Sequence, residues 1–259
     1  MGTRPTALIT GASGGIGLEL ARAAAGDGHD LVLVARSADR LESLATELRD
    51  GGGDVLVVPA DLGAVDGAAV VCDALGDRAV DVLVNNAGYA TWGPFDESDR
   101  AEQLGMIDLN VRALTELTHR LLPAMVHRRR GRILNVASTA AFFPGPLMAV
   151  YYATKNYVLA FSEALAEELD GSGVTVTALC PGPTESGFQA RAAMEESKLV
   201  KGRKIMAATP VAKAGWDGCR AGKRVVVPGP KNVALALMPR FLPRRLVARS
   251  VRNAQRAGH

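Results

Sequence analysis

The residues best suited to chemistry lie between Ser138 and Lys155, in the stretch STAAFFPGPLMAVYYATK. Tyr151 and Lys155 are four residues apart, so in a helix their side chains share one face. A phenol keeps its proton until about pH 10, and a nearby ammonium lowers that pKa. Tyr151 is therefore a candidate proton donor and acceptor, and the Ser138 hydroxyl could hold a carbonyl oxygen. Alone, this spacing is a common surface pattern, so the interpretation requires a cofactor site elsewhere.

A glycine-rich turn between an expected strand and an expected helix indicates such a cofactor site. Residues 6–10 are apolar and β-branched, which favours a buried strand, and a helical pattern follows the turn. Gly11, Gly15 and Gly17 allow the backbone to approach a pyrophosphate at the helix N-terminus. The spacing G-x-x-x-G-x-G differs from the common G-x-G-x-x-G, and the alternative is a plain glycine-rich loop.

The residue after the second expected strand indicates which dinucleotide is bound. NAD-binding folds usually place an acidic residue there for the ribose hydroxyls, whereas an arginine suits the 2′-phosphate of NADP. Here the strand ends in Arg36, with no acid beside it and with Arg40 four residues on. We therefore expect NADP(H), with NAD(H) less favoured. The alternative is a solvated arginine at a strand end.

Polar residues end the later apolar segments, where the carboxyl ends of parallel strands would line a ligand crevice. The Asp61 carboxylate either accepts a hydrogen bond from an adenine amino group or caps the next helix. Asn86 ends another segment, and Ser138 ends a third. Asn110 falls in a long helical region, residues 98–130, although its amide competes with the helical backbone.

Strand and helix patterns alternate along the chain. The segments expected as strands are residues 6–10, 31–35, 54–62, 80–88, 131–138, 174–184 and 224–229. This alternation predicts an α/β protein, a single-domain Rossmann fold with a doubly wound, seven-stranded parallel sheet flanked by helices. We expect that domain to span residues 1–230, with a substrate loop at about 185–210, and residues 231–259 to be a basic helical extension.

Cysteine and histidine are few and scattered. Cys72, Cys180 and Cys219 lie far apart, and the four histidines do not cluster. This argues against a disulfide framework and a metal site, and it indicates a reducing cytoplasm. The N-terminus enters an apolar segment too soon for a signal peptide, and no apolar run approaches the ~20 residues that span a bilayer.

Together these motifs resemble the classical short-chain dehydrogenase/reductase family. The matching pieces are TGASGGIG at 10–17, Asp61, NNAG at 85–88, Asn110, Ser138, Tyr151 with Lys155, and PGPT at 181–184. They occur in the family's order over about residues 6–230. Residues 140–190 and the ending VVVPG further resemble a DltE-like bacterial branch of reductases.

The resemblance implies a role for each matching residue. Tyr151 would be the general acid in reduction, Lys155 would lower its pKa and hold the nicotinamide ribose, and Ser138 would orient the carbonyl. Asn110, the fourth member of this catalytic set, would support a water path to solvent, and Thr184 would bind the nicotinamide carboxamide. The residues expected to contact the cofactor are Gly11, Ser13, Gly15, Ile16, Gly17, Arg36, Asp61, Leu62, Asn86, Ala87, Gly88, Tyr151, Lys155, Pro181, Gly182 and Thr184.

The activity that the resemblance implies is NADP(H)-dependent interconversion of a carbonyl and an alcohol, without a metal. The alternative is a non-catalytic NADP-binding sensor or scaffold on the same fold, because fold does not determine function. The complete catalytic set argues against this alternative, since a sensor could lose any of the four residues. The family further implies a homodimer or homotetramer formed through the long helices.

We expect three apolar segments to determine substrate specificity: residues 89–95, the residues after Ser138, and residues at about 185–210. Their large apolar side chains include Phe142, Phe143, Leu147, Met148, Phe188 and Met194. They favour a hydrophobic or acyl-type substrate, and the alternative is that they pack against the body or a partner subunit. The basic residues Lys198, Lys201, Arg203 and Lys204 either meet a phosphorylated carrier or form a solvated face.

The C-terminal tail is basic. From residue 231 onward there are seven basic residues and no acidic one, so the rest of the chain holds 23 basic against 27 acidic residues. Leu235, Met238, Leu242 and Leu246 recur at helical spacing. This predicts a basic amphipathic helix, interrupted by prolines, that either lies on an anionic membrane surface or docks on the body. Confinement of the charge to the tail argues against nucleic-acid binding.

Overall fold

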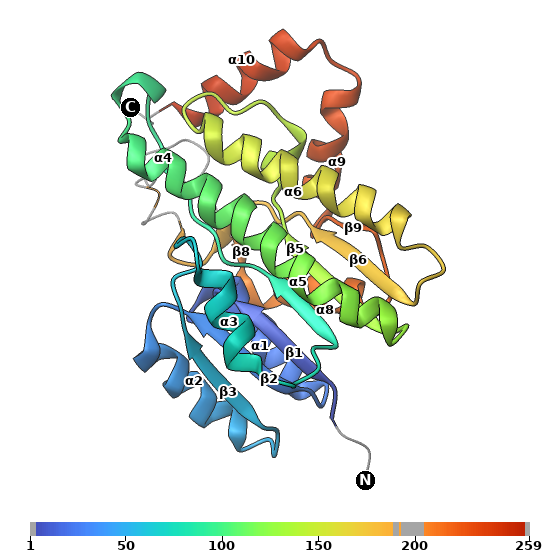
Figure 1. The fold of residues 1–259 in the computed structure, drawn as a ribbon. Helices are drawn as coiled ribbons and strands as arrows, with labels where there is room; N and C mark the ends of the chain where they lie inside the picture. The colour runs from blue at the N-terminus through green and yellow to red at the C-terminus, as the bar shows by residue number, and fades with distance from the viewer. Residues whose placement is uncertain (1–3, 189–191, 193–204, 257–259) are drawn as a thin grey trace.

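The computed structural model describes residues 4–188, 192 and 205–256, and its centre is a seven-stranded parallel sheet (Figure 1). The strand order is β3-β2-β1-β4-β5-β6-β9, and every neighbouring pair is parallel. The strands are β1 (Thr6–Thr10), β2 (Asp30–Ala35), β3 (Val55–Pro59), β4 (Val82–Asn85), β5 (Gly131–Val136), β6 (Val174–Leu179) and β9 (Val225–Val226). The sequence predicts each of these strands, because strands buried on both faces appear as apolar runs.

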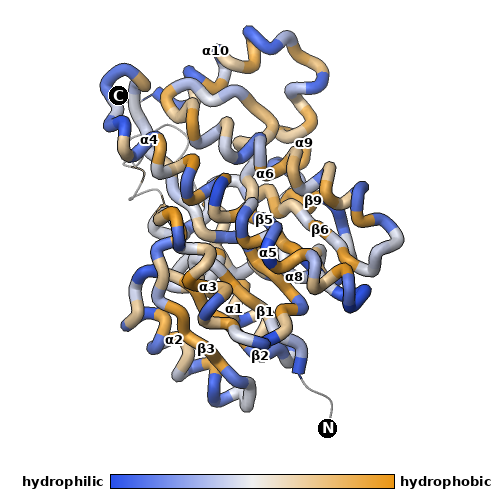
Figure 2. The backbone as a smooth tube through the Cα atoms, viewed as in Figure 1, coloured by the Kyte–Doolittle hydropathy of each residue, from blue (hydrophilic) through white to orange (hydrophobic). Residues whose placement is uncertain are grey.

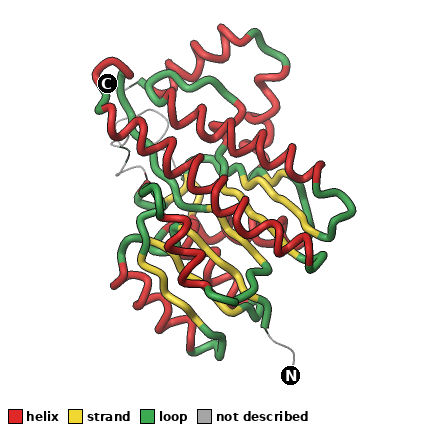
Figure 3. Tube along the Cα trace, viewed as in Figure 1, coloured by secondary structure: helices red, strands yellow, loops and turns green. Residues whose placement is uncertain are grey.

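Helices cover both faces of the sheet, as Figure 3 shows with red helices around yellow strands. One face packs against α1 (Gly15–Gly26), α2 (Ala38–Arg49) and α8 (Ala208–Arg220). The other packs against α3 (Gly67–Leu75), α5 (Leu114–His127) and α6 (Ala149–Glu168). The expected doubly wound α/β architecture is therefore confirmed.

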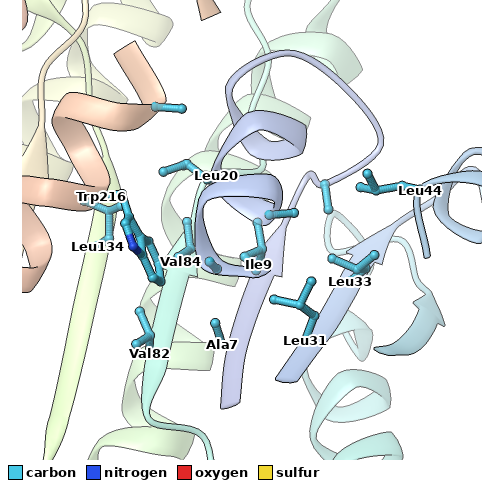
Figure 4. Packing of buried hydrophobic residues seen from close by; sticks show 14 of the residues in the cluster. Ala7, Ile9, Leu20, Leu31, Leu33, Leu44, Val82, Val84, Leu134 and Trp216 are labelled. Atoms are coloured by element: carbon cyan, nitrogen blue, oxygen red, sulfur yellow. The ribbon is translucent and has the colours of Figure 1, made fainter. Parts of the chain in front are cut away.

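The side chains of β1 divide the core into two layers. Ala7 and Ile9 point toward α1 and α8 and pack with Leu20 and Trp216 (Figure 4), whereas Leu8 packs on the opposite face. This follows from the alternation of side chains along a strand. In Figure 2 the central strands are mainly orange, which marks their hydrophobic residues, and blue segments lie toward the outside. The sheet is thus a buried platform for the residues at its carboxyl edge.

The order in which the strands are added to the sheet reverses at β1. The chain builds outward from β1 to β2 and β3, then returns to place β4 on the other side of β1. Such a reversal opens a crevice at the carboxyl ends of the strands, where ligands of doubly wound folds bind. The glycine-rich turn follows β1, and the NNAG segment follows β4, so both lie at this crevice.

The predicted helix at 98–130 is divided into three parts. It consists of α4 (Arg100–Ile107), a π-helical turn at Asp108–Ala113 and α5. Pro123 lies inside α5, whereas the irregular turn comes before α5 begins. Asn110 lies within the π-helical turn, and such turns are frequent at functional sites.

The C-terminal tail forms α9 (Pro230–Leu237), a 3-10 turn (Met238–Arg240) and α10 (Arg244–Gln255). Leu235, Leu242 and Leu246 are 39–50% exposed, so these three leucines are not the face that docks on the body. The breaks near Pro239 and Pro243 stop one helical period from running through the tail. α10 instead docks on the body through Val247 and Gln255, each 1% exposed.

Two smaller features complete the described part of the chain. Beside the main sheet, β7 (Thr184–Glu185) pairs in parallel with β8 (Met206–Ala207). Among the residues that the structure describes, no helix combines the length and apolar character that a membrane span requires. In the same residues, no three His, Cys, Asp or Glu side chains gather as metal ligands. The basic segment at 198–204 and Met194 lie outside the described residues.

Candidate active site

The glycine-rich turn is shaped by close packing. Gly11 and Gly15 adopt positive φ angles of 67° and 55°, which strain any other residue. A Cβ on Gly17 would collide with the Gly11 carbonyl and the Asn86 amide, so only glycine fits there. No side chain caps the N-terminus of α1, whose first residues line a cavity. This exposed helix N-terminus fits a pyrophosphate.

Thr10 joins the glycine-rich turn to the NNAG segment. Its Oγ1 donates to the Val84 carbonyl (3.1 Å) and accepts from the backbone N–H groups of Asn86 (2.9 Å) and Ala87 (3.0 Å). The Asn86 Nδ2 donates in return to the Thr10 carbonyl at 2.9 Å. The sequence does not predict this role of Thr10, because these hydrogen bonds depend on the pairing of two strands that lie about 75 residues apart in the chain.

Two arginines line the end of the cavity that lies near the glycine-rich turn. Arg36 follows β2 and Arg40 lies one helical turn later, and both are exposed and line the cavity. Among the described residues, neither guanidinium has a hydrogen bond or ion pair. Asp61 lines the same region, and its Oδ1 accepts from the Gly63 N–H at 2.9 Å. The carboxylate therefore caps a turn, whereas Asp66 occupies the N-cap position of α3.

α6 places Tyr151 and Lys155 on one face, as their spacing predicts. Both are buried, at 8% and 5% exposure, and the Lys155 Nζ lies 5.8 Å from the centre of the Tyr151 ring. The Nζ donates to the Val136 carbonyl at 2.8 Å, at the end of β5. Ser138 follows two residues later, and its Oγ accepts from the Ala140 N–H at 3.1 Å.

The electrostatics of this pair differ from the prediction. Burial raises the pKa of the Tyr151 phenol well above its usual value, and a hydrogen bond with the Ser138 side chain opposes the rise. Burial also lowers the pKa of Lys155 to about 8. The expected lowering of the Tyr151 pKa by Lys155 is thus wrong for this structure. Both groups lie away from water, and burial disfavours the charged form of each.

Asn110 is held by three hydrogen bonds. Its Oδ1 accepts from the Tyr89 N–H (3.1 Å), and its Nδ2 donates to the Tyr89 carbonyl (3.0 Å) and to the Thr154 hydroxyl (3.1 Å). A Cβ on Gly88 would lie 2.9 Å from the Asn110 Oδ1 and 3.7 Å from the Lys155 Nζ. Asn110 therefore ties the end of β4 to α6 beside the lysine.

One cavity of about 650 Å³ connects these groups, from Arg36 at one end to Gln255 at the other. Of the predicted site residues, only Gly17 and Asn110 do not line it. Those that do are Gly11, Ser13, Gly15, Ile16, Arg36, Asp61, Leu62, Asn86, Ala87, Gly88, Ser138, Tyr151, Lys155, Pro181, Gly182 and Thr184. Thr184 is buried, and its Oγ1 donates to the Gly182 carbonyl at 2.9 Å.

The substrate end of the cavity is only partly as predicted. Phe143, Met148 and Phe188 line it, whereas Phe142, Leu147 and the segment 89–95 do not. The cavity wall also includes residues that the sequence analysis did not assign to it. They are Tyr152 of α6 and, from the tail, Leu235, Met238, Ser250, Val251, Ala254 and Gln255. Their contribution depends on the docking of α10, which no local pattern shows.

Chemically, the cavity brings together three kinds of group. Next to the glycine turn it offers backbone N–H groups and the guanidinium groups of Arg36 and Arg40, which fit a phosphorylated dinucleotide. At its middle, the Tyr151 phenol and Ser138 hydroxyl can donate to an oxygen atom. Beyond them the wall is mainly apolar. This arrangement fits proton transfer to a carbonyl oxygen of a hydrophobic compound.

Comparison with known proteins gives matches over most of the chain. The family model described as "short chain dehydrogenase" matches residues 5–197. Ketoacyl reductase HetN of Nostoc sp. is 35% identical over 182 residues, or 70% of this chain and 63% of that protein. This chain therefore spans less than two thirds of the length of that relative.

Solved structures match a larger share of the chain. A short-chain dehydrogenase from Sphingobium yanoikuyae in complex with NADPH has a TM-score of 0.82 and 35% identity, covering 92% of this chain and 96% of that one. The bulky-bulky ketone specific alcohol dehydrogenase from Comamonas testosteroni has a TM-score of 0.78 and 30% identity, covering 92% and 99%.

Proposed function

The chain belongs to the short chain dehydrogenase family, and on that basis we propose that it is an NADP(H)-dependent oxidoreductase interconverting a carbonyl and an alcohol. The observation that carries the proposal is the shared cavity. Tyr151, Ser138 and Lys155 line the same space as the glycine-rich turn and Arg36. A proton donor and a cofactor cradle are both required for this reaction.

In the proposed reaction the cofactor supplies the hydride. Tyr151 donates its phenolic proton to the carbonyl oxygen while the Ser138 hydroxyl donates a hydrogen bond to the same atom. Both donors oppose the negative charge that develops on the oxygen in the transition state. Burial keeps the phenol protonated at neutral pH because it raises the pKa. This favours the reductive direction, in which the tyrosine acts as an acid.

We propose Lys155 and Asn110 as supports for this chemistry. Lys155 lines the cavity, and its Nζ donates to the Val136 carbonyl and lies near Gly88 of the NNAG segment. Asn110 fixes the backbone at Tyr89 and the Thr154 side chain, so it positions the segment that follows β4 against α6. We also propose that Asn110 supports a path of water molecules from Lys155 to solvent.

We propose NADP(H) in preference to NAD(H). Arg36 and Arg40 supply two guanidinium groups at the end of β2, and among the described residues nothing neutralises them. An unpaired guanidinium there can bind the 2′-phosphate. The structure from Sphingobium yanoikuyae contains NADPH, whereas other similar structures contain NAD or NADH, so the proposed preference rests on the two arginines.

We propose a hydrophobic or acyl-type carbonyl compound as substrate. Apolar side chains from three parts of the chain form the far wall of the cavity, among them Phe143, Met148 and Phe188. Two of the proteins compared above are a ketoacyl reductase and an alcohol dehydrogenase for bulky ketones. These names agree with an apolar pocket beside a proton donor.

A panel of ketones, aldehydes and 3-oxoacyl thioesters tests the proposed reaction. Purified protein and NADPH are mixed with each compound, and the loss of NADPH absorbance is followed. We expect turnover of at least one hydrophobic member. Tight NADPH binding without turnover of any member would contradict the proposed oxidoreductase activity and support the alternative, a non-catalytic NADP sensor or scaffold.

We propose that the chain is a homodimer or homotetramer. α4 exposes Leu104 and Ile107 at 52% and 43%, and these apolar side chains lie in the region 98–130, predicted as a long helix of the kind that the family resemblance assigns to subunit contacts. Light scattering after gel filtration gives the mass directly. An Ile107→Glu variant should shift the mass toward that of a monomer, and an unchanged mass would place the interface elsewhere.

We also propose a reducing, cytoplasmic location and, as a second candidate property, peripheral membrane contact. Cys72, Cys180 and Cys219 are all free thiols, which fits a reducing compartment. Phe241 is 82% exposed beside the basic residues of the tail, which fits an anionic lipid surface. Co-sedimentation with phosphatidylserine vesicles tests the contact, and failure of the wild-type chain to sediment would exclude it.

A further inference from the structure

α10 closes the end of the substrate cavity with one face. Ser250, Val251, Ala254 and Gln255 line the cavity, and residues spaced three or four apart share a helical face. The opposite face carries exposed arginines such as Arg249 and Arg252. We call Val251, Ala254 and Gln255 the C-terminal wall. The family match ends at residue 197, so this wall lies outside the part of the chain that the family model covers.

Gln255 holds the C-terminal wall in place. Its side chain is 1% exposed, and its Nε2 donates to the Tyr152 phenol at 2.9 Å. The same Nε2 lies 3.2 Å from the Met148 sulfur. The Gln255 backbone carbonyl accepts from the Trp92 indole at 2.9 Å. One residue near the end of α10 therefore contacts α6, the loop before it and the segment after β4.

The C-terminal wall faces the proton donor across an apolar space. The Tyr151 ring centre lies 5.4 Å from that of Phe188 and 6.1 Å from that of Tyr152. Tyr152 is in turn the side chain that Gln255 contacts. A carbonyl oxygen beside Tyr151 would therefore direct one substituent of the compound toward the wall. Ala254 is the smallest side chain of the wall, so it leaves the most room there.

We propose that the C-terminal wall determines which carbonyl compounds the protein accepts, with Ala254 admitting a bulky apolar substituent and Gln255 acting as the positioning residue. This inference rests on the proposed reductase function and adds the specificity element to it. The chemical class is a ketone that bears a ring or branched apolar group beside the carbonyl. An apolar wall recognises such a group through buried surface, and bulk added at Ala254 excludes it.

The first experiment adds bulk at Ala254. We expect Ala254→Phe to lower kcat/KM for benzophenone about tenfold or more, while kcat/KM for butanone and the affinity for NADPH change little. Asn253→Phe is the matched control, because Asn253 is exposed and lies outside the cavity lining. An Ala254→Phe profile equal to that of the control would overturn the inference while leaving the reductase function intact.

The second experiment tests Gln255 as a positioning residue. Gln255→Leu and Tyr152→Phe each remove the hydrogen bond between the two side chains, so their effects on KM for benzophenone should not add in the double variant. We expect KM to rise with little change in kcat or NADPH affinity. Additive effects, or a loss of kcat for every substrate, would show a general structural role instead.

A binding measurement separates failure of the inference from failure of the proposed function. Benzophenone binding is measured by calorimetry, which needs no turnover. If the wild-type protein binds benzophenone and Ala254→Phe does not, the role of the C-terminal wall is supported even when no compound is reduced. If neither the wild type nor the variants bind it, the inference is refuted whatever other substrates are turned over.

Discussion

At the scale of single residues, Tyr151 and Lys155 have pKa shifts that both favour the neutral form. Burial is the first cause of each shift, which raises the pKa of the phenol and lowers the pKa of the amine to about 8. The phenol therefore keeps its proton at neutral pH and can donate it. The lysine lies close to the pH at which its charge is lost, so its ammonium is sensitive to small changes in the cavity.

Lys155 makes stability depend on pH in the alkaline range. Its pKa is about 8 in the folded chain against 10.5 ordinarily, so the unfolded chain binds more protons between these values. Lys155 therefore contributes a rise in the free energy of unfolding as pH increases from about 8 toward 10. Cys180 and Cys219, whose pKa burial raises from 9.0 to about 12, oppose this contribution from about pH 9, and Tyr151 opposes it above about pH 10.

Urea unfolding at several pH values between these limits measures this effect. The free energy of unfolding of the wild type should rise relative to that of Lys155→Met between pH 8 and 10, because methionine keeps much of the volume and has no titrating group. Lys213→Met serves as the control, since Lys213 is an exposed residue paired with Asp217. A difference between the wild type and Lys155→Met that does not change with pH would contradict the lowered pKa of Lys155.

Arg36 should determine the preference for NADPH over NADH. Arg36→Asp replaces a donor to the 2′-phosphate by a repelling carboxylate, and we expect NADPH affinity to fall about tenfold to a hundredfold. NADH affinity should change much less. Fluorescence titration with both nucleotides gives the ratio, and Arg100→Asp makes the same charge change outside the cavity lining. An unchanged ratio would assign the preference to other residues.

At the scale of elements, the glycine-rich turn depends on close packing more than on flexibility. Gly14 has an extended backbone with nothing within 4 Å of an added Cβ, whereas an added Cβ on Gly17 meets the Gly11 carbonyl and the Asn86 amide. We expect Gly17→Ala to destabilise the fold by about 1–3 kcal/mol and Gly14→Ala to leave stability nearly unchanged. Thermal unfolding of the two variants compares them directly, and equal melting temperatures would contradict this packing.

The strands and the main motifs could be predicted because their causes are local. Buried parallel strands require apolar runs, and the step from Tyr151 to Lys155 places both on one face of any helix. The direction of the Tyr151 pKa shift could not be predicted, because it depends on burial by the whole fold. The roles of Thr10 and Gln255 depend on contacts between segments distant in the sequence, which no short pattern encodes.

The positions of the C-terminal helices also depend on contacts with distant segments, so local patterns could not predict them. The helical spacing of Leu235 and Leu246 predicts an amphipathic helix interrupted by prolines, and the chain does break near Pro239 and Pro243. α10 then presents a different face, centred on Val247, to the body. The position of a docked helix is decided by the surface that receives it, so its own sequence shows only that an apolar face exists.

At the scale of the whole molecule, the cavity draws on nearly the full length of the chain. The turn after β1, α6 and α10, whose places in the fold Figure 1 shows, all contribute residues to the cavity lining. The buried sheet holds the first two in fixed positions, whereas α10 is held by Gln255 and Val247. In the proposed reductase, the buried sheet and its loops would carry the reaction and the terminal helix would select the compound.

The most direct test of this account is the turnover of a Tyr151→Phe variant with NADPH and the best substrate of the panel. The change removes only the phenolic oxygen, so we expect turnover to fall by roughly a hundredfold or more while NADPH affinity stays close to that of the wild type. Tyr157→Phe, which removes an exposed phenol on the same helix, should keep wild-type turnover. Wild-type turnover in Tyr151→Phe would contradict the assignment of this residue as the proton donor.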